Sequence, residues 1–249
     1  MNAQVIFQDD FSGAATSDLG GTSPDVSING SSWITANSRG DAGAAQVFGA
    51  DGSIIKDGPN SSHDAGALLA YSLSANTIYT LEATFNNNDS GWVALGFASS
   101  DAILDGVNGR HSNGSATAFG GYAWGLTRNN SGTDQEIFNG IGTGNPAAGG
   151  DFVNPAQPVD FRVVLDTTNT AAITAEYFFN GTQFGGTQVL EAAAFGNISF
   201  VGISSDGRAG GEAASITNFS LTAQTIPEPS SLAFLIAGGL AMLGRRRGR

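Results

Sequence analysis

The chain of 249 residues contains no cysteine and only two histidines, and charged residues make up 13% of it. The lack of cysteine excludes disulfides, thiolate metal sites and a cysteine nucleophile. Both histidines, His63 and His111, lie in polar stretches rich in Gly, Ser and Asn, which argues against a histidine-rich zinc site.

The few charges are divided unevenly along the chain. Residues 1–225 hold six basic and twenty-one acidic residues, a net charge of −15, whereas the remaining residues hold four arginines and one glutamate, a net charge of +3. Because an acidic body repels phosphate backbones, nucleic acid is not an expected partner. The acidity suits either the solubility of an exported protein or scattered calcium sites.

The C-terminal segment 230–244 is apolar and uncharged, and Arg245, Arg246 and Arg247 follow it directly. Fifteen helical residues span about 22 Å, less than the ~30 Å hydrocarbon core of a bilayer, although snorkelling arginines close part of the gap. We expect a short transmembrane helix at 230–244, with the basic end 245–249 in the cytoplasm and the body outside it. The alternative is a buried helix, but the segment has no polar face.

Pro227, Glu228 and Pro229 precede this helix and can continue neither a strand nor a helix. The order of this motif, an apolar segment and an arginine cluster resembles the PEP-CTERM sorting domain. The resemblance implies that Pro227, Glu228 and Pro229 are recognised by exosortase, a membrane-bound processing enzyme of Gram-negative bacteria, with cleavage nearby. It divides the chain into a body, 1–224, and a sorting and anchoring segment, 225–249.

The expected location is therefore the cell envelope, the cell surface or the extracellular matrix, after initial anchoring in the inner membrane. Residues Met1–Gln4 lack the basic and apolar regions of an export leader. We expect the leader to be absent from this chain or encoded upstream of it.

Alternation of apolar and polar residues in the body predicts strands rather than helices. Asn180-Gly181 is a strong signal for a two-residue hairpin. A two-sheet antiparallel sandwich or jelly roll accounts for these segments. The expected strands are Val5–Phe11, Ile78–Phe85, Trp92–Phe97, Gly121–Leu126, Val159–Asp166, Ile173–Phe179, Thr182–Phe184, Ile198–Ile203 and Ile216–Leu221.

The order of these segments resembles the concanavalin A-like lectin and glucanase sandwich, in particular its laminin-G-like branch. Four pieces carry the resemblance: residues 7–11, the strands at 79–81 and 91–97, the segment 161–166 with the hairpin after it, and a closing strand at 216–221 that would pair near the first. The resemblance implies a fold that contains many sugar binders and some glycosidases.

Catalysis is not expected. Glycosidases of that fold use a Glu-x-Asp-x-x-Glu pattern, which places two carboxylates on one strand face, and the sequence lacks it. The nearest spacing, Asp134-Gln135-Glu136, follows a turn-forming stretch and is interpreted as the rim of a turn. No Gly-x-Ser-x-Gly nucleophile motif is present.

Binding of carbohydrate or exopolysaccharide is the favoured function of the body. Trp92, Tyr122 and Trp124 can stack on sugar rings, although aromatic residues on strands also pack inward. The long connection 99–120 is of a length that is functional or disordered in compact domains. It supplies the polar candidates Asp105, Asn108, Arg110 and His111.

A structural calcium ion is a further expectation, with no other cofactor. Asp9 and Asp10 near the start and Asn218 in the closing strand would approach each other if those strands pair, and oxygen ligands suit Ca²⁺. Two alternatives to carbohydrate binding stay open: a structural matrix or surface protein without a defined ligand, and a polysaccharide hydrolase with an unrecognised site.

Overall fold

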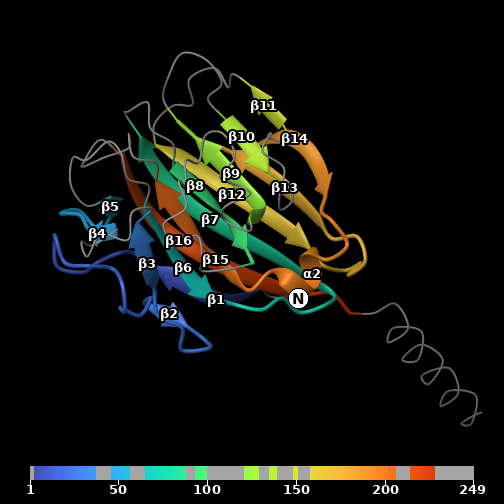
Figure 1. Ribbon diagram of the computed structural model, residues 1–249, viewed down its shortest axis with the longest axis horizontal. Coiled ribbons are helices and arrows are strands. Elements are labelled where there is room, and N and C mark those ends of the chain that lie inside the picture. The colour runs from blue at the N-terminus through green and yellow to red at the C-terminus, as the bar shows by residue number, and fades with distance from the viewer. Residues whose placement is uncertain are drawn as a thin grey trace, which may run out of the picture.

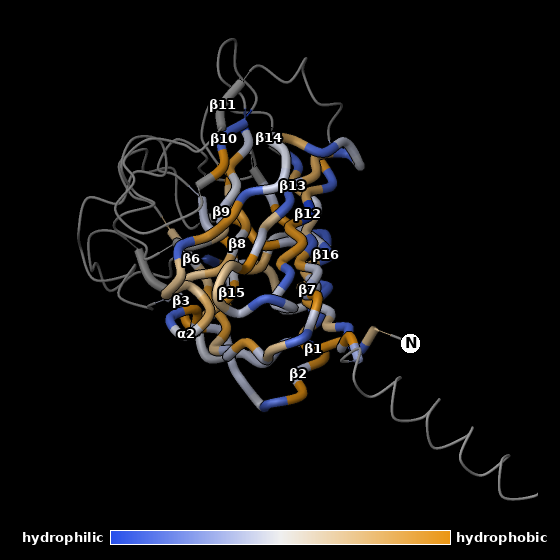
Figure 2. The backbone as a smooth tube through the Cα atoms, turned by 90° about the vertical axis from the view of Figure 1, so that its right-hand side faces the viewer, coloured by the Kyte–Doolittle hydropathy of each residue, from blue (hydrophilic) through white to orange (hydrophobic). Residues whose placement is uncertain are grey.

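A computed structural model describes residues 3–37, 46–56, 65–87, 93–99, 121–128, 135–138, 148–150, 158–205 and 214–227. Two antiparallel sheets, here named sheet A and sheet B, pack face to face (Figures 1 and 2). Their apolar faces meet in the interior, where buried residues of both sheets form one hydrophobic cluster. The predicted two-sheet antiparallel sandwich is confirmed.

Sheet A has the strand order β14-β13-β12-β7-β16-β1-β2, with β4 and β5 attached at the side of β16. Its strands are β1 (Gln4–Asp9), β2 (Val26–Ser27), β4 (Gln46–Phe48), β5 (Ile54–Lys56), β7 (Thr77–Asn87), β12 (Val159–Asp166), β13 (Thr174–Phe179), β14 (Thr182–Val189) and β16 (Ala214–Thr225). The first and last strands pair, with Asp9 opposite Phe219. This pairing confirms the expectation that the closing strand lies next to the first.

Sheet B has the strand order β11-β10-β9-β8-β15-β6-β3. Its strands are β3 (Ile34–Asn37), β6 (Ala65–Ala70), β8 (Val93–Ala98), β9 (Gly121–Thr127), β10 (Gln135–Phe138), β11 (Ala148–Gly150) and β15 (Phe200–Ser205). A single turn of helix, α2 (Ala194–Asn197), precedes β15. Gln135 and Glu136 are the first residues of β10, beside the connection from β9, and Asp134 lies outside the described residues.

The core is built by the period-2 residues of the central strands. Strand β12 alternates buried and less buried residues along its whole length, as its sequence predicts. The ring of Phe161 stacks on Phe179 at 4.5 Å between centroids and lies 5.8 Å from Phe85. The residues of these strands that were expected to face inward are buried: Tyr79, Leu81, Ala83, Phe85, Val159, Phe161, Val163, Leu165, Ile173, Ala175, Tyr177 and Phe179.

The hairpin between β13 and β14 turns at Asn180 and Gly181, whose φ angles are 48° and 77°. Positive φ at both central residues is what a type I′ turn requires, and its twist matches that of the flanking strands. The sequence signal for this hairpin is confirmed.

Strand β16 continues to Thr225, and Pro227 after it is exposed. The remaining predicted sorting and anchoring residues, 228–249, lie outside the described residues. They include Glu228, Pro229, the helix at 230–244 and the three arginines. Within the described ranges, no helix is long and apolar enough to cross a membrane.

Candidate functional site

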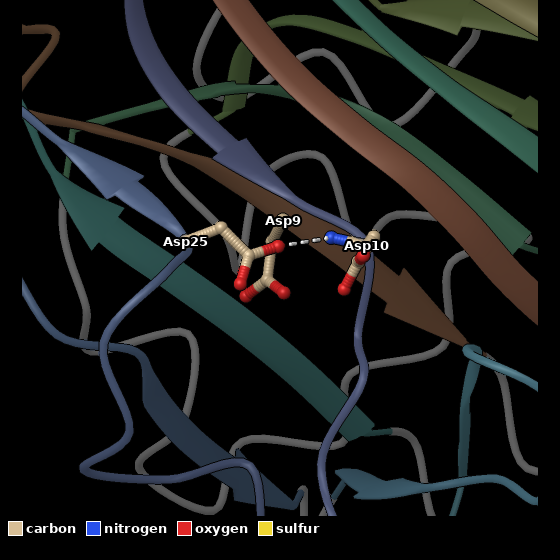
Figure 3. A group of neighbouring side chains, drawn as sticks. All are labelled: Asp9, Asp10 and Asp25. Atoms are coloured by element: carbon tan, nitrogen blue, oxygen red, sulfur yellow. Dashed lines mark hydrogen bonds between the residues drawn. The ribbon is translucent and has the colours of Figure 1, made fainter.

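Three carboxylates meet where β1 ends. Oxygen atoms of Asp9, Asp10 and Asp25 all lie within 4.8 Å of one another (Figure 3). Asp9 is 5% exposed, whereas Asp10 and Asp25 are exposed. Sequence reasoning missed Asp25, which comes close only because Gln8 of β1 pairs with Val26 of β2.

The carboxylate of Asp9 is occupied by structural hydrogen bonds. Nε1 of Trp33 donates to its Oδ2 at 2.7 Å, and the backbone N–H of Phe11 donates to its Oδ1 at 2.8 Å. Burial raises the pKa of Asp9 above its ordinary value, the two hydrogen bonds oppose this rise, and the charges of Asp25 and Asp10 add to it. Asp9 therefore anchors the β1 end to Trp33.

Asp10 and Asp25 each accept one backbone hydrogen bond through one carboxylate oxygen. Oδ2 of Asp25 accepts a hydrogen bond from the backbone N–H of Asp10 at 2.9 Å, and Oδ1 of Asp10 accepts one from Ser12 at 3.1 Å. Among the described residues, the second oxygen of each exposed carboxylate accepts no hydrogen bond, and hard cations such as Ca²⁺ prefer carboxylate oxygens as ligands.

Asn218 lies beside this cluster because β16 contains a bulge. The register against β7 shifts between Thr217 and Ser220, and Asn218 has a φ of 55°, a left-handed conformation that Asn tolerates better than most residues. Asn218, Asp9 and Asp10 line the same hollow. The three predicted metal ligands therefore line one hollow, and the carboxylate of Asp25 lies beside those of Asp9 and Asp10.

That hollow has a volume of about 650 Å³ and lies on the outer face of sheet A. Its floor consists of outward-facing side chains of β1, β16, β7, β12 and β13, and both polar and apolar groups line it. The side chains that line it include Gln8, Glu82, Thr84, Asp160, Arg162, Phe178 and Ser220. None of them was among the sequence candidates.

The outer face of sheet B is different, because an apolar cluster covers its centre. Trp124 is 1% exposed and packs with Leu126, Ala94 and Leu68. A Cβ atom at Gly96 would collide with the Trp124 side chain, so the indole lies directly over the glycine of the neighbouring strand. Trp124 is thus a packing residue of this face in the observed conformation.

Glu136 lies on the same side of sheet B, opposite Leu126. It is half-buried, and burial raises its pKa, while the charge of Arg128 opposes the rise. Within the described strands of sheet B, Glu136 is the sole carboxylate. The two-carboxylate arrangement of glycosidases is therefore not met by those strands.

The other predicted sugar-binding residues cannot be placed in the same way. Trp92, Asp105, Asn108, Arg110 and His111 lie outside the described residues, and Tyr122 belongs to β9 with its side chain outside the description. Trp92 precedes the start of β8, whereas the connection 99–120 leaves its other end.

The sequence matches no protein-family model and no curated relative. Solved structures do match the fold. The carbohydrate recognition domain of Emp47p superposes with a TM-score of 0.53 and 14% identity, covering 90% of this chain and 97% of that domain. The metal-free carbohydrate recognition domain of Emp46p superposes with a TM-score of 0.51 and 14% identity, covering 79% of this chain and 89% of that domain.

Lectin II from Ulex europaeus gives a TM-score of 0.50 and 12% identity, with 88% of this chain and 97% of the lectin covered. Identities this low establish architecture alone, which here is two antiparallel sheets packed face to face. The chain therefore has the concanavalin A-like β-sandwich fold of these lectin domains.

Proposed function

We propose that this chain is an exported surface or matrix protein whose β-sandwich binds carbohydrate without catalysing its hydrolysis. The observation that carries the proposal is the likeness of 90% of the chain to a domain named for carbohydrate recognition. The single carboxylate in the described strands of sheet B counts against the hydrolase alternative. The structural-protein alternative predicts no glycan binding at all.

We place the binding site on the outer side of sheet B. Trp124 and its apolar neighbours form a firm base there. Asp105, Asn108, Arg110 and His111, together with Trp92 and Tyr122, are the proposed contacts, and the side chains of all six lie outside the description. Carboxylate, amide and guanidinium groups of this kind form the few oriented hydrogen bonds that give a ligand site its specificity.

Glycan binding by the purified full-length chain is the direct test. On a glycan array we expect a defined set of ligands, and Asp105→Ala should weaken the best of them at least tenfold, or about 1.4 kcal/mol, because a ligand hydroxyl loses its acceptor. Asp51→Ala is the matched control, since Asp51 is an exposed aspartate in the β4–β5 turn. An array without any bound glycan would refute the proposed function, and equal binding by Asp105→Ala would refute this contact.

We also propose that Asp9, Asp10, Asp25 and Asn218 hold a structural Ca²⁺, with water completing its six to eight oxygen ligands. Calcium at 100 times its Kd should stabilise the fold by about 2.7 kcal/mol, which a thermal melt with Ca²⁺ and with EDTA would detect as a higher Tm. Asp25→Asn should remove most of that rise, whereas Asp51→Asn should keep it. An equal rise in both variants would rule out this site.

The sorting role of the tail remains a proposal that rests on its sequence order. Pro227 is exposed directly after the last strand, which suits a processing motif placed between a folded body and a membrane. The proposed partners are an exosortase-type enzyme, the membrane through 230–244, and a polysaccharide.

A further inference from the structure

The hollow on sheet A contains a row of side chains that crosses five strands. Register pairs connect Gln8 to Ser220, Ser220 to Glu82, Glu82 to Arg162, and Arg162 to Phe178. All five line the hollow. Because residues directly opposite each other lie about 5 Å apart, the row forms a continuous polar strip at right angles to the strands.

Arg162 is the best-defined element of this strip. Its guanidinium carbon lies 4.2 Å from the centroid of the Phe178 ring, a stacking contact that limits where the side chain can go. In the described part of the structure, its Nε is buried and makes no hydrogen bond. Buried polar atoms are nearly always paired, so this unpaired Nε is an exception.

Glu82 stands opposite Arg162 on β7, yet no ion pair between the two is found among the described residues. Asp160 is oriented differently, because Oγ1 of Thr84 donates to its carboxylate at 2.9 Å. The hollow thus offers a carboxylate acceptor and a guanidinium donor side by side, which together can hold two neighbouring hydroxyl groups of one ligand.

The charge of the hollow restricts the ligand. Glu82 and Asp160 outnumber Arg162 among the charged side chains of the hollow that lie outside the proposed calcium site, so an anionic ligand would be repelled. The volume of about 650 Å³ falls within the 300–1,000 Å³ of small-ligand sites. A polyhydroxylated, uncharged molecule matches the size, the surplus of acceptors and the apolar wall that Phe178 provides.

We propose that the hollow over β1, β16, β7, β12 and β13 binds a short segment of an uncharged glycan, with Glu82 accepting and Arg162 donating hydrogen bonds to its hydroxyl groups. Phe178 packs against a sugar ring, and Gln8 and Ser220 extend the site toward β1. This site is separate from the one proposed on sheet B, since it lies on the opposite face of the sandwich. The chain would then hold glycan on two sides.

The test is a titration of the ¹⁵N-labelled full-length chain with laminarihexaose, maltohexaose and cellohexaose, followed by backbone amide shifts. At least one hexasaccharide should shift amides of β7, β12 and β13. Arg162→Met and Glu82→Gln should each weaken this binding at least tenfold while leaving the Tm unchanged. Glu176→Gln is the matched control, because Glu176 faces the same side of β13, outside the hollow, where it accepts a hydrogen bond from Thr187.

Several results would overturn this proposal. One is that no hexasaccharide shifts the amides of sheet A. Shifts confined to β8, β9 and β10 would also overturn it, but would leave the proposed function on sheet B intact. Unchanged affinity in both hollow variants would exclude Glu82 and Arg162 as contacts. Tighter binding of hexagalacturonate than of the neutral sugars would contradict the charge argument, and concentration-dependent shifts without sugar would assign the face to a second copy of the chain.

Discussion

Replacing Trp33 with alanine is expected to lower the free energy of unfolding by about 4 kcal/mol, a large part of the 5–15 kcal/mol typical of a folded domain. The indole is 1% exposed and packs edge-on against Phe219, with 5.0 Å between the ring centroids. Its centroid lies 6.0 Å from that of Phe11. Its removal leaves a cavity, and it also leaves the buried Asp9 carboxylate without the donor at 2.7 Å. Chemical denaturation with urea measures the change.

Trp33→Phe separates these two contributions. The phenyl ring keeps most of the packing, while the lost indole N–H costs about 1–3 kcal/mol because a buried acceptor is left unpaired. That hydrogen bond favours the charged form of Asp9, whose pKa is already raised by burial. Without it, the pKa rises further.

The pH dependence of Trp33→Phe follows from this shift. When a carboxyl has a higher pKa in the folded state than in the unfolded state, the free energy of unfolding falls as the pH rises from the unfolded pKa through the folded pKa. The deficit of Trp33→Phe relative to the natural chain should therefore be largest at neutral pH and should shrink in acid, below the unfolded pKa of Asp9. A deficit that is the same at pH 3 and pH 7 would show that packing alone is responsible.

The second large effect is expected where the two sheets touch. A Cβ atom at Gly125 of β9 would overlap the ring of Phe161 on β12, with Cε1 at 3.1 Å. Gly125→Ala should therefore cost about 2 kcal/mol through overpacking. Gly196→Ala is the control, because a Cβ there meets no atom within 4 Å, and its stability should stay unchanged or rise slightly.

A double mutant tests the stated cause. If the Phe161 ring is what the added methyl meets, Phe161→Leu makes room for it, and Gly125→Ala/Phe161→Leu should be less destabilised than the sum of the single variants by about 1–2 kcal/mol. Additive losses would mean that the cost of Gly125→Ala arises from its own backbone.

Sheet A could be predicted from the sequence better than sheet B, for a physical reason. The strands β7, β12 and β13 carry polar residues on the outer face, so the alternation is visible, and the hairpin residues Asn180 and Gly181 mark the turn. Strand β6 reads AGALLA and is buried on both faces along most of its length, so no alternation reveals it. It was not expected.

The candidate sites divide in the same way. Asp9, Asp10 and Asn218 could be associated because the first and last strands were expected to pair, and they do. Asp25 and the Arg162–Glu82–Phe178 row depend on which strands become neighbours and in which register. Single residues on separate strands carry no local signal of that kind, so only the folded sheet shows them together.

The position of β16 has a consequence for how the chain is made. This strand lies between β7 and β1, so the β1–β2 ribbon cannot join the rest of sheet A until Ala214–Thr225 has been synthesised. Pairings of such long sequence separation also form slowly. A nascent polypeptide therefore cannot complete sheet A until its last strand has left the ribosome.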